Sequence, residues 1–352
     1  MPTVPASRSP AGASAALSLF RVSLALMVML EHLSASVPPQ TGRLAVEAFF
    51  CISGFLITMV ASGRYAGRPA AFLANRFLRI YPTYWACLAV GFAVVVLVPG
   101  SVAIHPSLVM PSTAADWIAN LGVFGLTQQT MSRMLPAAWS LHTELWFYIV
   151  IGLVTAIRPR ASLAMLAVSL AFSAYCAFWW GPVDFYGTPL GNADAFFIGS
   201  VVFQHRAQLA PRRPLLIAAI ALAAFEGLAW GPYLPTQAVS EFLGAPVTGV
   251  LLLGLWNADL DTVLGRWKEA CNTLGRLSYP LFLLHWPLGA LVASAAGLAQ
   301  GWALFALAGA LSVAVAVVVL WCIEEPLVRL RAQIRSSRPD REFGESMQAI
   351  SD

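Results

Sequence analysis

Two side chains with complementary chemistry, Arg21 and His32, lie eleven residues apart near the start of the chain. Eleven residues make about three turns of an α-helix, so both side chains project from one face, roughly 16 Å apart along the axis. A guanidinium binds phosphate through paired hydrogen bonds, and an imidazole accepts protons near neutral pH. The spacing predicts an anion site and a proton-transfer site on one helix. The alternative is an arginine that reaches for the membrane surface and a histidine at the interface.

A second cationic pair, Arg76 and Arg79, is three residues apart and therefore shares one face of a helix. Two guanidinium groups side by side favour a phosphate-bearing ligand. The alternative is a helix anchored at the level of lipid head groups.

Acidic side chains inside apolar runs form the third set, because ionisable groups in hydrocarbon are costly and point to function. Its members are Glu47, Glu144, Asp194, Glu226 and Glu241. Carboxylates and imidazoles suit hydroxyl-rich ligands and proton transfer. A carboxylate such as Glu144 is expected to fix the tautomer of a nearby histidine.

Composition assigns these residues to a membrane protein. The 352 residues are 59% hydrophobic and 11% charged, with a mean hydropathy of +0.72. That is too apolar for a soluble protein of this size. The net charge of +4 includes no basic stripe interleaved with aromatic residues, so no nucleic-acid partner is predicted. Five widely spaced cysteines predict buried free thiols, with neither a disulfide framework nor a metal site.

An all-α membrane domain over residues 15–328 is predicted, between a leader (1–14) and a charged, disordered tail (329–352). About 20 apolar residues span a bilayer. Ten segments qualify: 15–33, 44–62, 83–104, 137–157, 162–180, 190–203, 214–230, 241–256, 277–298 and 302–323. The first segment lacks a clear cleavage site and is expected to be a retained helix. Segment 114–121, in the loop after the third, is expected to lie in the membrane interface.

The basic residues predict that both termini are cytoplasmic. With ten alternating helices, 18 of the 21 basic residues fall on the inner side, two (Arg43 and Arg133) on the outer side, and Arg21 inside a helix. The inverted arrangement contradicts the positive-inside rule. Arg21, Arg76 and Arg79 then lie toward the cytoplasm, whereas His32 and the acidic residues lie in the outer half.

Six ordered motifs resemble the acyltransferase-3 family of bacterial membrane proteins, which acylate sugars of surface polysaccharides, lipopolysaccharide and antibiotics. They are Arg21-x10-His32, EAFFCISGFLI (47–57), RFLRIYPTYW (76–85), WSLHTELWFY (139–148), SYPLFLLHWP (278–287) and EEP (324–326). Together they cover roughly residues 15–330. The resemblance implies a multi-pass protein of the bacterial cytoplasmic (inner) membrane.

The resemblance also implies roles for single residues. His32 is expected to be the catalytic base, with Glu144 orienting it or the sugar, and Arg21, Arg76, Arg79 and Tyr84 are expected to bind acyl-CoA. The expected acceptor-pocket residues are Glu47, Ser53, Trp139, Ser140, Asp194, Tyr279 and His285. His285 is equally well explained as a hydrogen-bonded buried histidine, Ser53 as a helix-packing residue and Trp139 as a packing or interface aromatic. No serine nucleophile is predicted.

Acyl-CoA, most simply acetyl-CoA, is the implied co-substrate, and no bound cofactor is implied. The implied acceptor is a sugar or polysaccharide hydroxyl, free or lipid-linked, and the remaining partners are membrane lipids. Two rivals stay open: a proton-coupled transporter or glycan flippase, and a histidine-dependent acyltransferase of another membrane family. The sequence shows no internal repeat of the kind that many transporters carry.

Overall fold

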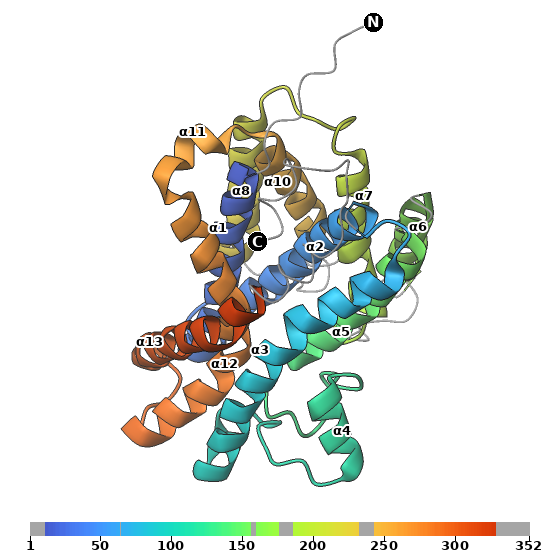
Figure 1. The fold of residues 1–352 in the computed structure, drawn as a ribbon. Coiled ribbons are helices and arrows are strands. Elements are labelled where there is room, and N and C mark those ends of the chain that lie inside the picture. The colour runs from blue at the N-terminus through green and yellow to red at the C-terminus, as the bar shows by residue number, and fades with distance from the viewer. Residues whose placement is uncertain (1–10, 64, 156–159, 176–185, 232–242, 329–352) are drawn as a thin grey trace, which may run out of the picture.

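Helices make up the regular structure of the computed structural model, which describes residues 11–63, 65–155, 160–175, 186–231 and 243–328. No strand occurs within these ranges. The helices are α1 (Ala11–Ser34), α2 (Gln40–Ser62), α3 (Pro69–Leu97), α4 (Ala114–Gly122), α5 (Ala138–Val150), α6 (Arg160–Tyr175), α7 (Ala193–His205), α8 (Pro214–Trp230), α10 (Ala245–Asn257), α11 (Leu260–Leu264), α12 (Lys268–Ala296) and α13 (Trp302–Val319). Figure 1 shows α1, α2 and α12 at the centre. The all-helical prediction is confirmed for this part of the chain.

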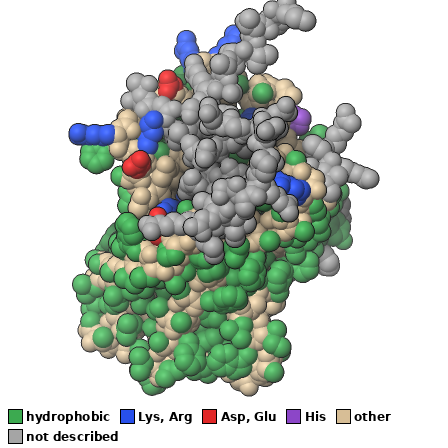
Figure 2. Space-filling view, viewed as in Figure 1, with side chains coloured by type: hydrophobic (Ala, Val, Ile, Leu, Met, Phe, Trp, Pro, Cys, Tyr) green, Lys and Arg blue, Asp and Glu red, His purple; other side chains and the backbone are tan. Residues whose placement is uncertain are grey.

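Each of the ten predicted segments overlaps a helix, but only five helices in the described part are long and apolar enough to cross a membrane. They are Ser14–Ser34, Gln40–Ser62, Pro69–Leu97, Gly265–Ala296 and Trp302–Val328. Charged side chains gather at the end where α1 begins, and most of the remaining surface in this view is apolar (Figure 2). The chain is therefore a helical, multi-pass membrane protein, while the ten crossings and the cytoplasmic termini stay predictions.

Two predicted helix bounds are wrong. The third segment was expected at 83–104, yet α3 begins at Pro69 and ends at Leu97, so Arg76 and Arg79 lie on the same helix as this segment. The ninth was expected at 277–298, yet α12 begins at Lys268. Charged residues end an apolar run without ending a helix, since helical hydrogen bonding does not depend on hydropathy.

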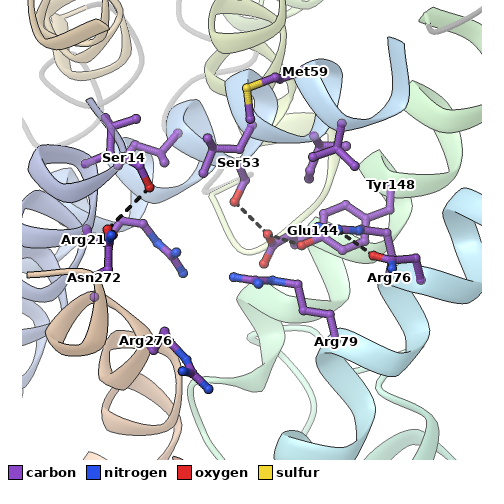
Figure 3. A pocket seen from close by; sticks show the side chains of 18 of the residues that line it. Ser14, Arg21, Ser53, Met59, Arg76, Arg79, Glu144, Tyr148, Asn272 and Arg276 are labelled. Carbon is purple, nitrogen blue, oxygen red and sulfur yellow. Dashed lines mark hydrogen bonds between the residues drawn. The ribbon is translucent and has the colours of Figure 1, made fainter. Parts of the chain in front are cut away.

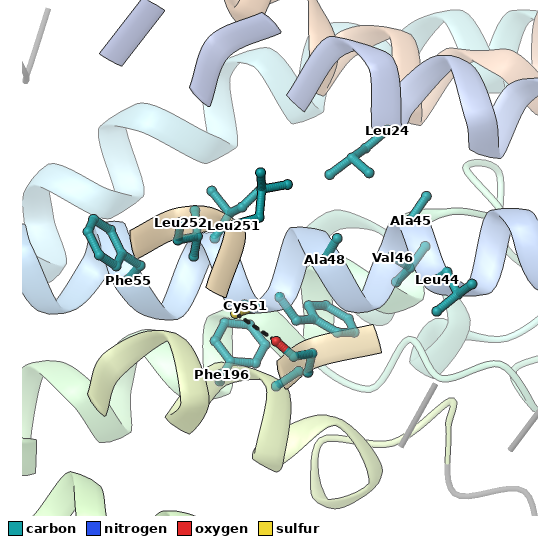
Figure 4. Packing of buried hydrophobic residues seen from close by; sticks show 14 of the residues in the cluster. Leu24, Leu44, Ala45, Val46, Ala48, Cys51, Phe55, Phe196, Leu251 and Leu252 are labelled. Carbon is teal, nitrogen blue, oxygen red and sulfur yellow. Dashed lines mark hydrogen bonds between the residues drawn. The ribbon is translucent and has the colours of Figure 1, made fainter. Parts of the chain in front are cut away.

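Helix α2 packs along α7, and α1 packs along α12. At the α2–α7 contact, Cys51 and Phe196 are both fully buried (Figure 4). Gly54 faces the backbone carbonyl of Phe196, and Gly199 faces the backbone carbonyl of Cys51, so a Cβ at either glycine would collide with the partner helix. Small residues at such a contact let helix backbones approach closely. Ser53, next to Gly54, is thereby held against the bundle interior.

The loop after α3 folds back onto that helix through α4. A capping box at Thr113 and Asp116 starts α4. Its last carbonyls, on Asn120, Leu121 and Gly122, accept hydrogen bonds from Tyr84 Oη (2.5 Å), Trp85 Nε1 (2.9 Å) and Tyr81 Oη (2.7 Å). Helix ends leave such carbonyls unsatisfied, and they must be paired wherever water is scarce. The aromatic residues of the 76–85 motif therefore secure this loop.

The cysteines follow the prediction with one exception. Cys51, Cys87 and Cys271 are free and buried, whereas Cys322 is free and exposed, contrary to expectation. Cys176 lies outside the described residues, as do the tail after residue 328 and leader residues 1–10.

Substitution of Gly199 by alanine should destabilise the α2–α7 contact by about 1–3 kcal/mol, as overpacking does, because its Cβ would meet a backbone carbonyl that cannot move alone. Gly227→Ala in α8 is the matched control, since nothing lies within 4 Å of its added Cβ. Thermal unfolding in detergent measures both. Equal melting temperatures for Gly199→Ala and Gly227→Ala would contradict the proposed close contact.

Candidate active site

Four arginines from three helices line one cavity of about 170 Å³. Arg21 comes from α1, Arg76 and Arg79 from α3, and Arg276 from α12 (Figure 3). Other lining residues include Ser53, Glu144, Tyr148 and Asn272. Guanidinium groups that converge in this way suit an anion with several oxygens, because each can donate two parallel hydrogen bonds.

Helix α3 sets the position of two of these arginines. Arg76 Nη2 donates to Asn75 Oδ1 at 2.8 Å, and Arg79 follows three residues later on the same face. Pro82 lies within α3 and removes one backbone donor, yet the helix continues past it. The predicted face with two arginines is therefore present, and it borders the cavity.

Glu144 lies among these arginines, away from His32. Ser53 Oγ and Tyr148 Oη donate to Glu144 Oε1 at 2.7 Å and 2.6 Å. The expectation that Glu144 lies on the outer side and fixes the His32 tautomer therefore needs correction. Its carboxylate offsets part of the positive charge of the cavity and leaves two hydroxyl groups in fixed orientations.

The carboxylate that contacts His32 belongs to its neighbour. Glu31 Oε2 lies 2.5 Å from His32 Nδ1. A carboxylate accepts, so the proton lies on Nδ1 and Nε2 carries the lone pair in the neutral ring. Gly42 leaves room for this arrangement, because a Cβ there would lie 2.9 Å from Glu31 Oε2.

Residues Gln300 and Gly301 donate hydrogen bonds to the C-terminal end of α1, beside His32. Gln300 Nε2 donates to the His32 carbonyl at 2.9 Å, and the Gly301 amide donates to the Leu33 carbonyl at 2.8 Å. These bonds satisfy carbonyls that the helix end would otherwise leave unpaired. His32 is consequently held by its backbone as well as by Glu31.

Aromatic rings cover the other side of His32. The His285 ring stacks on it at 5.4 Å and 12°, and the Trp286 ring lies 4.7 Å away at 30°. His285 is fully buried, and its Nδ1 lies 2.7 Å from the Phe282 carbonyl. That carbonyl only accepts, so His285 Nδ1 is the donor. Both predicted histidines thus lie side by side, each anchored through Nδ1.

A third histidine, His105, approaches from the loop between α3 and α4. Its ring meets Trp286 edge-on at 4.5 Å. The Ser107 amide donates to His105 Nδ1 at 3.2 Å, so the neutral ring carries its proton on Nε2. Burial, together with the nearby Arg133 and His32, lowers the pKa of His105 to about 4. His105 is therefore neutral near pH 7.

Helix α1 connects the two sites, with Arg21 at the cavity and His32 in the histidine cluster. Their separation of eleven positions corresponds to roughly 16 Å of helix axis. One part of α1 therefore borders a cationic cavity, and the other part borders the rings of His285 and Trp286.

The remaining predicted residues lie outside both sites. Tyr84 is fully buried with its hydroxyl on the Asn120 carbonyl, and Tyr279 Oη donates to the Ile80 carbonyl at 3.3 Å. Neither lines the cavity. Tyr84 therefore makes a structural contact with α4, and its acyl-CoA contact stays a prediction.

The other four acceptor candidates are near α2, α5 and α7. Glu47 and Asp194 are each 1% exposed. Trp139 packs on the Tyr186 ring at 5.0 Å, and Ser140 Oγ donates to the Ala137 carbonyl at 2.9 Å. None of the four lines the arginine cavity, so the structure separates them from Ser53, which does.

The sequence analysis did not identify three residues that the structure places at these sites. Arg276 counted only toward topology, Glu31 is adjacent to His32 where helical neighbours do not normally face each other, and His105 lies in a loop outside every motif. The polar run before the 278–287 motif is the one signal that pointed to Arg276. Within the described ranges, no group of three His, Cys, Asp or Glu residues is placed to hold a metal ion.

Comparison with known proteins gives three matches. Residues 14–321 match the acyltransferase-3 family, described as "Acyltransferase domain". "Putative membrane-bound transacylase BcsY" of Komagataeibacter xylinus is 26% identical over 70% of this chain and 66% of its own length. "Exopolysaccharide production protein ExoZ" of Rhizobium meliloti (strain 1021) is 34% identical over 31% of this chain and 33% of its own length. The chain therefore spans slightly less than two thirds of the first relative and a third of the second. No solved structure matches.

The low pKa of His105 predicts a pH effect on stability. Between the ordinary value of 6.5 and about 4, the unfolded chain binds a proton at this residue that the folded chain does not bind. Stability should therefore fall as the pH drops through this window, and the residue should contribute no change above it. The melting temperature of His105→Asn in detergent should fall less than that of the wild type between about pH 7 and about pH 5. Parallel curves for the two proteins would contradict the assignment.

Proposed function

This chain belongs to the acyltransferase-3 family, and from that premise we propose that it moves an acyl group, most simply acetyl, from cytoplasmic acyl-CoA to a hydroxyl of a sugar or polysaccharide. The names of its two relatives, a transacylase and an exopolysaccharide production protein, support this acceptor class. The observation that carries the proposal is the pairing, on α1, of an arginine-lined cavity with a histidine anchored by a carboxylate.

The cavity is proposed to bind the phosphate groups of acyl-CoA. Arg76 and Arg79 on α3 and Arg21 on α1 offer guanidinium donors to phosphate oxygens, and Glu144 offsets part of their positive charge. The long, thin pantetheine arm then runs along α1 toward His32. Delivery from the cytoplasm depends on the predicted orientation of the arginines.

His32 is proposed to act as the general base. Its Nε2 takes the proton of the acceptor hydroxyl while the hydroxyl oxygen attacks the thioester carbonyl carbon. A C–O bond forms, the C–S bond breaks, and the His32 imidazolium returns the proton to the departing thiolate. Glu31 accepts the Nδ1 hydrogen bond throughout, which keeps the ring oriented and stabilises its positive charge. No acyl-enzyme is needed.

Loss of the base should stop the reaction. His32→Ala is expected to lower kcat by roughly 10²–10⁴-fold. Glu31→Gln should lower it by a smaller factor, because an amide oxygen can still accept from Nδ1 but does not stabilise the positive charge of the ring. The assay follows thiol release from acetyl-CoA with candidate glycans added to the purified protein. His205→Gln, at the end of α7, is the control. Full activity of His32→Ala would refute the base assignment, and glycan uptake without loss of the thioester would favour a transporter.

Substitutions that change the charge of the cavity should alter the KM for acyl-CoA and leave the KM for the acceptor unchanged. Arg79→Ala should raise the KM for acyl-CoA by roughly tenfold or more, the size of a charge-assisted hydrogen bond, and Arg79→Lys should recover only part. Glu144→Gln should lower that KM, because it removes a negative charge beside the phosphates while keeping an acceptor for Ser53 and Tyr148. The acceptor KM should stay unchanged in each case.

The exposed loop arginine Arg212, changed to alanine, controls for a general loss of positive charge. A raised acceptor KM in the Arg79 variants, or an Arg212→Ala effect of equal size, would contradict a phosphate site in this cavity.

A further inference from the structure

Arg276 is a fourth guanidinium of the arginine cavity that the proposed mechanism leaves unused. It lies on α12, far from α1 and α3 in sequence. In Figure 3, the side chains of Arg21, Arg79 and Arg276 extend from three helices toward one open space. Convergence from three directions is how a protein surrounds a ligand with several charges.

Two carboxylates that follow α13 contact Arg276. Glu325 Oε2 lies 2.9 Å from Arg276 Nη1, and Glu324 Oε2 lies 3.8 Å from Arg276 Nε. Glu324 Oε1 also accepts from Thr83 Oγ1 of α3 at 3.2 Å. The contact with Glu325 is a hydrogen bond, whereas that with Glu324 is too long to be one.

The arrangement leaves donor capacity on Arg276. Its Nη2 is buried and makes no hydrogen bond to any described residue. A buried donor without a partner costs free energy, so a ligand oxygen that supplies the partner is favoured. The side chains of Arg276, Glu324 and Glu325 are 25%, 18% and 27% exposed, so solvent weakens their ion pairs. A phosphate group can therefore replace the carboxylates.

A local irregularity presents the two carboxylates to α12. Residues Leu320–Glu324 form a π-helical turn between α13 and Glu325. Such turns shift the register of the side chains that follow, and they occur frequently at functional sites. Glu324, at the end of this turn, and Glu325, directly after it, both contact Arg276.

We propose that Arg276 is a further phosphate ligand of the acyl-CoA cavity, and that Glu324 and Glu325 hold it until a phosphate group of acyl-CoA displaces them. The inference rests on the proposed function, because the ligand is acyl-CoA. Four arginines against the single carboxylate of Glu144 fit a ligand with several phosphate charges, and acyl-CoA carries three phosphoryl groups. The exchange involves no covalent step.

Equilibrium binding of CoA to the purified full chain in detergent tests whether phosphate displaces the two carboxylates from Arg276. Substitution of Arg276 and substitution of the glutamates should change the CoA affinity in opposite directions. Arg276→Gln should weaken CoA binding roughly tenfold or more, the loss of a charge-assisted contact. The double substitution Glu324→Gln with Glu325→Gln should tighten it, because the guanidinium no longer has competing carboxylates. In the triple variant the glutamate changes should have no further effect, because they act through Arg276.

A purely structural ion pair gives a different pattern. Removing either side of the pair would then lower the melting temperature equally and leave CoA affinity unchanged. That result, or tighter binding on the glutamate changes even without Arg276, would overturn the inference. Arg276→Lys, which keeps the charge, guards against misfolding of Arg276→Gln and should retain part of the affinity.

Arg79→Ala separates failure of the inference from failure of the proposed function. If Arg79→Ala weakens CoA binding and Arg276→Gln does not, the cavity binds CoA and only the role of Arg276 is wrong. If the wild-type protein does not bind CoA, the proposed function is wrong and the inference is overturned with it.

Discussion

The cost of placing charge inside an apolar helical body governs this structure. Guanidinium groups cannot be buried among hydrocarbon side chains without counter-charges, hydrogen-bond acceptors or a solvated cavity. Arg21, Arg76, Arg79 and Arg276 all line one cavity. Asn75 accepts a hydrogen bond from Arg76, and Glu325 accepts one from Arg276. The convergence of these groups is the basis for the proposal that the cavity binds a multiply charged anion.

Helix α1 fixes the distance between Arg21, at the cavity, and His32. A helix is stiff and rises 1.5 Å per residue, so the separation of Arg21 and His32 changes little as other elements move. Its C-terminal end is fixed by hydrogen bonds from Gln300 and Gly301, and its side by packing on α12. A ligand bound by phosphate at one end therefore has its reactive end presented at a fixed depth.

Close helix packing and the returning loop support the two sites from outside. The glycines at the α2–α7 contact bring Ser53 to the cavity wall, where it donates to Glu144. The aromatic donors of α3 hold the C-terminal end of α4, and the chain before α4 brings His105 to Trp286. The aromatic donors satisfy α4 carbonyls that the surrounding apolar medium would leave unpaired, so these bonds both stabilise the fold and position the loop.

The sequence by itself determined the class of the protein, its helical character and the motifs of its family, because hydropathy and spacing are local properties. It also placed Arg21 and His32 on one face, and Arg76 and Arg79 on another, from the period of the helix alone. It did not determine which side chains meet between helices. Glu144 lies among the arginines, Glu31 makes the contact with His32 that was predicted for Glu144, and Arg276 lines the cavity. Those pairings depend on how α1, α3, α5, α12 and the π-turn after α13 are rotated and packed. Rotation and packing are set by long-range contacts that no local pattern encodes, so only the tertiary structure decided them.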